Sequence, residues 1–123
     1  MKARGHAIAD VARVLDDLAE QHLQSDARYA QAYLRSRAER GYGPQRIALE
    51  LKQRGASAEV IQRALSEAER DWLDLAVRAD RKKFGDNADK TLTTTIKRRR
   101  YLEYRGFAAE QIKAVLNAEH ELD

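Results

Sequence analysis

The chain has 123 residues, of which 35% are charged, yet its formal net charge is only +3. This length corresponds to one ordinary domain, and the absence of cysteine excludes a disulfide framework, a thiolate metal site and a cysteine nucleophile. No stretch reaches the roughly eighteen apolar residues of a membrane span, and the start lacks the apolar core of a signal peptide. We therefore expect a cytoplasmic protein that does not associate with membranes.

Helices are predicted almost throughout, because the chain has one proline and few β-branched residues. Asp26 is the predicted N-cap of a helix that ends near Arg40, where Gly41 can adopt the left-handed conformation of a helix C-terminus. Pro44 suits the first turn of the next helix, which is expected to end at Gly55.

The later helices follow the same plan. Ser57 is the predicted N-cap of a helix with one apolar face, formed by Ile61, Ala64, Leu65 and Ala68. A second apolar stripe contains Trp72, Leu75, Ala76 and Ala79. Gly85-Asp86-Asn87 marks a break before a helix that ends at Gly106, and a last helix should span about 109–119. No glycine or proline marks the boundary between the third and fourth helices.

One motif occurs twice in full. The pattern L-x-x-R-G-x-x-A-E-x-I-x-x-x-L covers residues 51–65 and again 102–116. A fainter copy begins at Arg4-Gly5, where Val11 and Leu15 follow at the same spacing. Self-similarity at a fixed period indicates a duplicated supersecondary unit whose copies bury a shared core.

The predicted fold is all-α, an elongated array of three-helix repeats with two complete copies and one partial copy at the N-terminus. Residues 1–25 would be the last helix of the incomplete repeat, and 26–70 and 71–123 would be the complete ones. We expect the equivalent apolar residues Ile61, Leu65, Ile112 and Leu116 to be buried. Gly55 and Gly106 should adopt positive φ.

Positive charge is concentrated in two segments. Residues 28–54 hold seven basic and two acidic residues, and residues 78–105 hold ten and four. Basic side chains interleaved with tyrosines are typical of phosphate contact and base stacking, whereas the alternative is a solvated helix face with tyrosines at a repeat junction. The predicted partner-binding residues are Arg81, Lys82, Lys83, Lys90, Lys97, Arg98, Arg100, Tyr101 and Tyr104, with Arg35, Arg37 and Arg46 as a second group. Lys90, Lys97, Arg100, Tyr101 and Tyr104 should share one face.

Catalytic and metal chemistry find no support in the sequence. His6, His22 and His120 are far apart, and none has a partner at the spacing of a two-ligand metal face. We see no carboxylate acid/base pair and no Ser/His/Asp arrangement. Gly41-Tyr42-Gly43-Pro44 resembles a phosphate loop but lacks the preceding strand, so we interpret it as a turn between helices. We expect no enzyme, metal or cofactor.

A combination of residues spread along the chain resembles the RecX family, the regulatory proteins of the RecA recombinase. The resemblance covers nearly the whole chain and depends on Asp26-Ala-Arg28-Tyr29-Ala30, Arg37, Gly41-Tyr42-Gly43-Pro44, Ile47, Glu50-Leu51 and Gly55, followed by Leu102, Arg105-Gly106-Phe107 and Ile112. Family members usually carry two further helices before the position of Arg4-Gly5. Apolar residues from Ile8 to Leu18 would then lie open to solvent or to another copy.

The resemblance implies a non-catalytic modulator that lies in the groove of the RecA–DNA filament, bridges neighbouring protomers and inhibits ATP hydrolysis and strand exchange. Its implied roles are in recombination, DNA repair and the SOS response. Its implied partners are the RecA filament and single- or double-stranded DNA, with a monomer in the groove and self-association left open through the first helix. The alternative from another class is a small helical protein that binds nucleic acid by itself.

Overall fold

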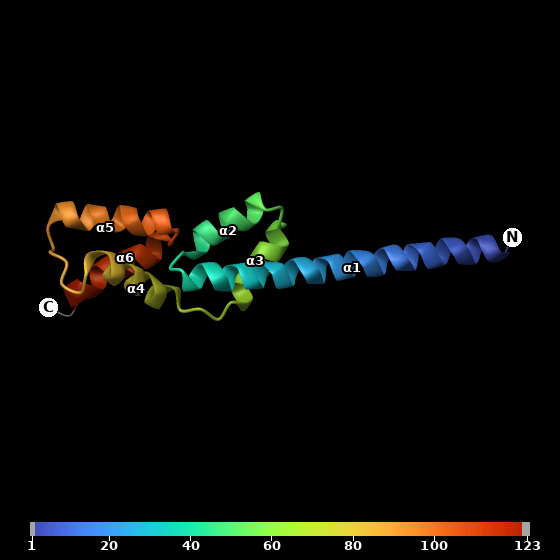
Figure 1. The fold of residues 1–123 in the computed structure, drawn as a ribbon, viewed down its shortest axis with the longest axis horizontal. Helices are drawn as coiled ribbons and strands as arrows, with labels where there is room; N and C mark the ends of the chain where they lie inside the picture. The colour runs from blue at the N-terminus through green and yellow to red at the C-terminus, as the bar shows by residue number, and fades with distance from the viewer. Residues whose placement is uncertain (1, 122–123) are drawn as a thin grey trace.

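The computed structural model describes residues 2–121, and the side chains of residues 10–117. These residues form helices and no strand, which confirms the predicted all-α class. The helices are α1 (Lys2–Glu39), α2 (Pro44–Gln53), α3 (Ala58–Glu67), α4 (Trp72–Phe84), α5 (Leu92–Arg105) and α6 (Ala109–Glu121). The molecule is a rod in which α1 projects alone at one end, and α4 to α6 form the other end (Figure 1). In the described part, no helix combines the length and apolar character needed to cross a membrane.

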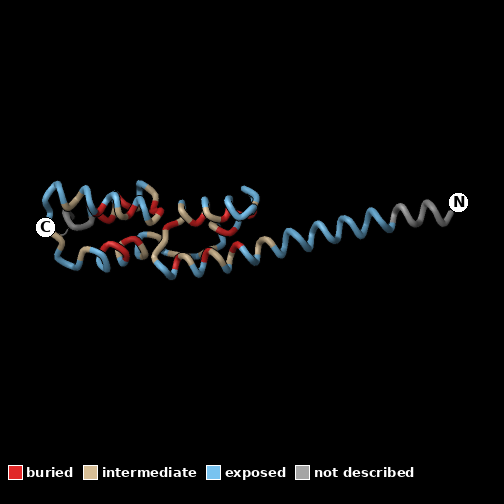
Figure 2. Tube along the Cα trace, turned by 45° about the horizontal axis from the view of Figure 1, so that its top comes forward, coloured by how far each residue is buried: buried red, intermediate tan, exposed pale blue. Residues whose placement is uncertain are grey.

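The first complete repeat, called the first repeat from here on, consists of the second half of α1 together with α2 and α3. These three helices all contact one another, and buried residues line their shared interior (Figure 2). The core comprises Ala30, Leu34, Ala38, Ile47, Leu51, Val60, Ile61 and Ala64. The burial of Ile61 is as predicted, whereas Leu65 is only half-buried at the edge of this core.

The second repeat consists of α4, α5 and α6, which again contact one another in all three pairs. Its core comprises Ala76, Ala79, Leu102, Phe107, Ile112, Val115 and Leu116. Leu51 and Leu102, which open the two copies of the motif, are both fully buried. Ile61 is buried in the first core and Ile112 in the second, so the duplicated motif contributes the same residue to each core.

Most predicted helix ends are confirmed. The Ser57 hydroxyl accepts a hydrogen bond from the backbone N–H of Val60 and so caps α3. Gly55 and Gly106 follow α2 and α5 with φ of +94° and +96°, in the left-handed region that favours glycine. The boundary that carried no signal lies between α3 and α4, where the Asp71 carboxylate caps α4.

The predicted helix start at Asp26 is wrong, because α1 continues through this residue without a break. No glycine or proline occurs between His6 and Arg40 to stop the helix. The Asp26 carboxylate lies 3.5 Å from His22 Nε2, one turn earlier, instead of capping a new helix. The helix assigned to residues 1–25 is therefore fused to the first helix of the next repeat, and the domain boundary proposed there stays a prediction.

The first half of α1 carries an exposed apolar stripe. Val11, Val14, Leu15 and Leu18 are 54–59% exposed, and Figure 2 shows this part of the helix standing free of the two repeats. The faint copy of the motif at Arg4-Gly5, and Ile8, lie outside the residues whose side chains are described.

Candidate binding surface

The turn between α1 and α2 joins the two repeats. Gly43 N–H donates to the carbonyl oxygen of Arg105 at 2.7 Å, and Gln45 N–H donates to that of Gly106 at 2.9 Å. A Cβ on Gly43 would lie 2.5 Å from the Gly106 carbonyl, so only glycine allows this approach. The turn therefore forms a close backbone contact between the repeats, in agreement with its interpretation as a turn between helices.

Three guanidinium groups surround Tyr42 in this turn. Their central carbons lie 3.8 Å (Arg37), 4.3 Å (Arg105) and 4.7 Å (Arg46) from the ring centroid, within the range of cation–π attraction. Burial opposes ionisation of the tyrosine, but the three positive charges together lower the pKa of Tyr42 below its ordinary value. The junction is thus strongly cationic, and the Tyr42 ring contacts all three of these guanidinium groups.

Glu50 neutralises part of this positive charge. Its carboxylate accepts hydrogen bonds from Tyr33 Oη at 3.0 Å and from Arg37 Nε and Nη2 at 2.9 Å each, and from Arg46 Nε at 3.3 Å. Burial would raise the pKa of Glu50, but these donors outweigh it and lower the pKa. Arg37 and Arg46, both predicted partner contacts, are therefore half-buried members of an internal network.

Arg98 is also removed from the predicted surface. Its side chain is 2% exposed and forms a two-pronged ion pair with Asp80 of α4, at 2.9 Å from Nε to Oδ1 and 2.7 Å from Nη2 to Oδ2. A buried guanidinium must be paired in this way. Because Arg98 lies on the inner face of α5, its side chain leaves little surface for the predicted partner contact.

The two tyrosines of α5 have separate environments. Tyr101 is half-buried and packs edge to face against Phe84 of α4, with ring centroids 5.7 Å apart. Tyr104 is 69% exposed and lies 4.9 Å from the Arg46 guanidinium, at the junction of the repeats. Of the two, Tyr104 has the largely exposed ring, whereas Tyr101 fits the alternative interpretation of a packed junction residue.

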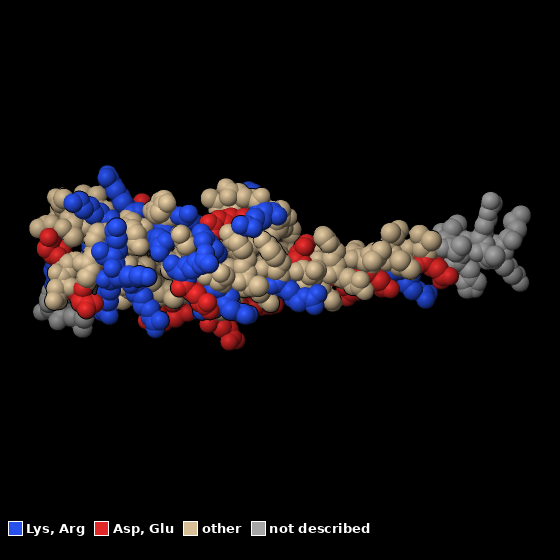
Figure 3. Space-filling view, viewed as in Figure 1, with Lys and Arg blue, Asp and Glu red and all other residues tan. Residues whose placement is uncertain are grey.

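The other predicted basic residues are on the surface. On the face shown in Figure 3, Lys and Arg atoms gather over the second repeat and its junction with the first. The exposed predicted residues are Arg35, Arg81, Lys82, Lys83, Lys90, Lys97 and Arg100. We call the members on α4 and α5, namely Arg81, Lys82, Lys83, Lys97 and Arg100, the basic surface.

A pocket of about 300 Å³ lies where the two repeats meet. Five basic residues and one acidic residue are among those that line this junction pocket: Arg40, Arg70, Arg78, Lys82, Arg105 and Glu39. Of the five cations, the sequence predicted Lys82 alone, because the others are far apart in the chain: Arg40 follows α1, Arg70 precedes α4, Arg78 lies within α4 and Arg105 ends α5. The repeated Arg-Gly pair, which contains Arg105, was the available signal.

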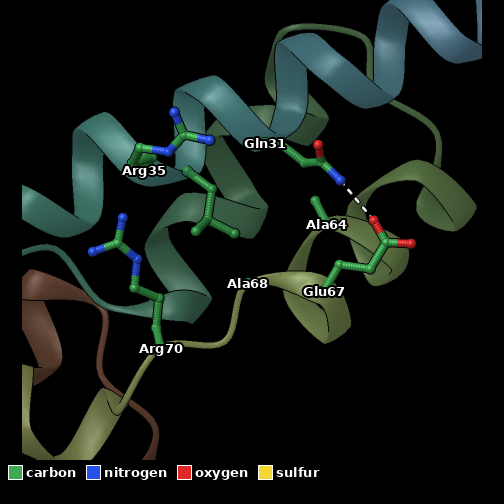
Figure 4. Close-up of a pocket in the computed structure, with 7 residues that line it drawn as sticks. Gln31, Arg35, Ala64, Glu67, Ala68 and Arg70 are labelled. Atoms are coloured by element: carbon green, nitrogen blue, oxygen red, sulfur yellow. Dashed lines mark hydrogen bonds between the residues drawn. The ribbon is translucent and has the colours of Figure 1, made fainter.

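A second pocket, of about 240 Å³, lies between α1 and the end of α3. Arg35 and Arg70 flank one side, and on the other side the Gln31 amide donates to the Glu67 carboxylate at 2.6 Å (Figure 4). Arg70 also lines the junction pocket, so the two hollows share a wall. Nothing in either pocket resembles a catalytic or metal centre, and the described residues contain no group of three His, Asp or Glu side chains that could hold a metal ion.

Comparison with known proteins places these features in a family. The family model described as the second three-helix domain of RecX matches residues 25–65. "Regulatory protein RecX" of Halorhodospira halophila is 41% identical over 98% of this chain and 74% of that protein. The protein of the same name from Chromohalobacter salexigens is 44% identical over 92% and 74%, and that from Legionella pneumophila strain Corby is 36% identical over 94% and 77%. With this identity over most of both lengths, the chain belongs to the RecX family of regulatory proteins.

Proposed function

We propose that this chain is a non-catalytic inhibitor of the RecA recombinase that binds in the groove of the RecA–DNA filament. The single observation that carries the proposal is the membership of the RecX family over 98% of the chain. In this role the protein acts as a monomer in the cytoplasm and limits recombination, DNA repair and the SOS response.

The shape and charge of the molecule support this role. An extended rod of consecutive repeats offers a long surface to a filament, and each repeat can meet a different protomer (Figure 1). The basic surface suits either DNA phosphates or acidic protein patches, whereas the acidic stretch of α1 at residues 10–27 suits basic protein surface. Such complementarity sets the register and the rate of association more than it sets affinity.

The direct experiment measures RecA-catalysed, single-strand-DNA-dependent ATP hydrolysis with increasing amounts of this protein. We expect inhibition by the wild type and weaker inhibition by the double variant Lys97→Glu/Arg100→Glu. The matched control is Arg13→Glu/Lys113→Glu, which changes the net charge equally but places the changes on α1 and α6. Circular dichroism should show unchanged helicity in both, because exposed charges contribute little to stability.

Two outcomes would contradict the proposal. Absence of inhibition by the wild type would remove the recombinase as the partner. Equal inhibition by the folded Lys97→Glu/Arg100→Glu variant would leave the basic surface as a solvated face and would redirect the search to the surroundings of Arg35 and Arg46. Substitutions at Asp16 and Asp17 are expected to have smaller effects than those at Lys97 and Arg100.

A stand-alone nucleic-acid-binding protein is the second candidate. The exposed Tyr104 ring beside Arg46 favours it, because an aromatic face next to a cation can stack on a base. Binding of a fluorescent DNA strand without recombinase, measured at several salt concentrations, separates the candidates. A phosphate binder should lose affinity steeply with salt and should need no recombinase.

A further inference from the structure

The junction pocket has an unbalanced charge. Five basic side chains and the single carboxylate of Glu39 line it. The cations come from both repeats: Arg40 and Arg70 belong to the first repeat and its connection to α4, and Arg78, Lys82 and Arg105 belong to the second. Because like charges repel across a small volume, this arrangement is costly unless an anion joins it.

Internal partners satisfy only part of this set. Arg78 pairs with Asp74 at 2.9 Å, and Arg70 lies 3.8 Å from Glu39. The side chains of Arg40 and Lys82 form no hydrogen bond or ion pair within the described part of the chain. Arg40 and Lys82, which come from different repeats, are therefore both available to one ligand in the pocket.

Arg105 adds an unmet donor beside the pocket. Its Nη2 donates to the Arg40 carbonyl oxygen at 3.1 Å, and its guanidinium lies 4.3 Å from the Tyr42 ring centroid and 5.7 Å from that of Tyr101. Its Nε is buried and has no acceptor. A buried charged donor without an acceptor is destabilising, so the local arrangement favours the arrival of one.

We propose that the junction pocket binds a terminal phosphate group, as carried by pyrophosphate or a phosphomonoester. Such a group has nearly two negative charges at neutral pH and three acceptor oxygens, which match guanidinium and ammonium donors. A volume of about 300 Å³ is sufficient for a phosphate or pyrophosphate group. A phosphodiester inside a strand, with one charge, fits this pocket less well.

Binding there would also connect the two repeats. A phosphate held by Arg40 on one side and Lys82 on the other bridges α1 and α4, next to the hydrogen bonds that join Gly43 to Arg105. Because the ligand binds only the folded junction, it should raise the melting temperature progressively as its concentration rises above the dissociation constant.

The first test is calorimetric titration of the full chain with inorganic pyrophosphate. We expect saturable binding, weakened about tenfold or more by Arg40→Ala and by Lys82→Ala, since each removes a charge-assisted hydrogen bond. The matched control is Lys113→Ala, an exposed cation on α6 outside the pocket, and it should bind as the wild type does. No saturable binding, or equal weakening by all three substitutions, would overturn the proposal.

The second test separates the sources of the phosphate. The probes are a short DNA strand with a 5′-phosphate and the same strand with a 5′-hydroxyl group. A preference for the 5′-phosphorylated strand that Arg40→Ala abolishes identifies a DNA end as the source, whereas equal binding of both strands beside tight pyrophosphate binding identifies a small free phosphate. Neither test contains recombinase, so the proposed filament role and this site can fail independently.

Discussion

The two repeats have the same helical plan but different interiors. Ile47, four residues before the motif, is fully buried in the first repeat, and Arg98, four residues before the second copy, is buried in the second repeat. Asp80 lies one turn after the buried Ala76, as Leu34 lies one turn after the buried Ala30. The core of the first repeat is thus apolar, whereas the interior of the second also holds the buried ion pair of Arg98 with Asp80, whose two members depend on each other.

The largest expected effect comes from breaking the ion pair. Arg98→Ala should lower the free energy of unfolding by about 3–5 kcal/mol, because it leaves Asp80 buried without a partner. Chemical denaturation monitored by circular dichroism measures this loss. A cost below about 1 kcal/mol would contradict the burial of the pair.

The double variant Asp80→Leu/Arg98→Ile sharpens the comparison, since it replaces the ion pair by apolar residue types found in the first core. Replacing a buried ion pair by well-packed apolar residues is often neutral or stabilising. We therefore expect a stability near or above that of the wild type. If the double variant is as unstable as Arg98→Ala, the two interiors are not equivalent.

The last leucine of the motif should respond differently in the two copies. Leu116→Ala is expected to cost about 2–5 kcal/mol because Leu116 is buried. Leu65→Ala should cost less, because Leu65 is half-buried at the edge of the first core. The same denaturation measurement on both variants decides this, and equal costs would contradict the observed difference in burial.

The two motif glycines share a conformation but differ in surroundings. A Cβ on Gly106 would collide with Arg46 Cβ, whereas a Cβ on Gly55 meets nothing within 4 Å. Gly106→Ala should therefore cost about 2–4 kcal/mol, from left-handed strain and the collision, and Gly55→Ala only about 1 kcal/mol. Thermal unfolding of both variants tests the difference. Similar melting temperatures would mean that the residues around Gly106 adjust to the added methyl group at little cost.

The Glu50 network at the junction of the repeats should depend on pH. The pKa of Glu50 is lower in the folded protein, so its stabilisation is complete above the ordinary glutamate pKa and is lost as the pH falls through the lowered value. Glu50→Gln should cost about 1–2 kcal/mol at pH 7 and progressively less below about pH 4. A cost independent of pH would show that the charge of Glu50 does not matter.

The sequence was most informative where local chemistry decides the structure. The left-handed glycines, the cap at Ser57 and the apolar periodicity depend on near neighbours, so they could be predicted. The burial and pairing of Arg98 could not be predicted, because its partner Asp80 is eighteen residues away and no local pattern marks the pair. The junction pocket depends on contacts between repeats, such as that of Gly43 with Arg105, which a linear pattern does not contain. The missed continuity of α1 shows that one favourable cap residue does not end a helix.

The unbroken α1 also fixes a rotational phase along the rod. Each helical residue turns the chain by about 100° and advances it by about 1.5 Å. The exposed stripe around Leu15 and the core face around Leu34 are therefore held at a fixed angle to each other about the axis of α1. One residue inserted near Asp26 would turn any partner on the stripe by more than a quarter turn while leaving both repeats intact. The length of α1 thus sets the direction in which any partner bound to the stripe lies relative to the two repeats.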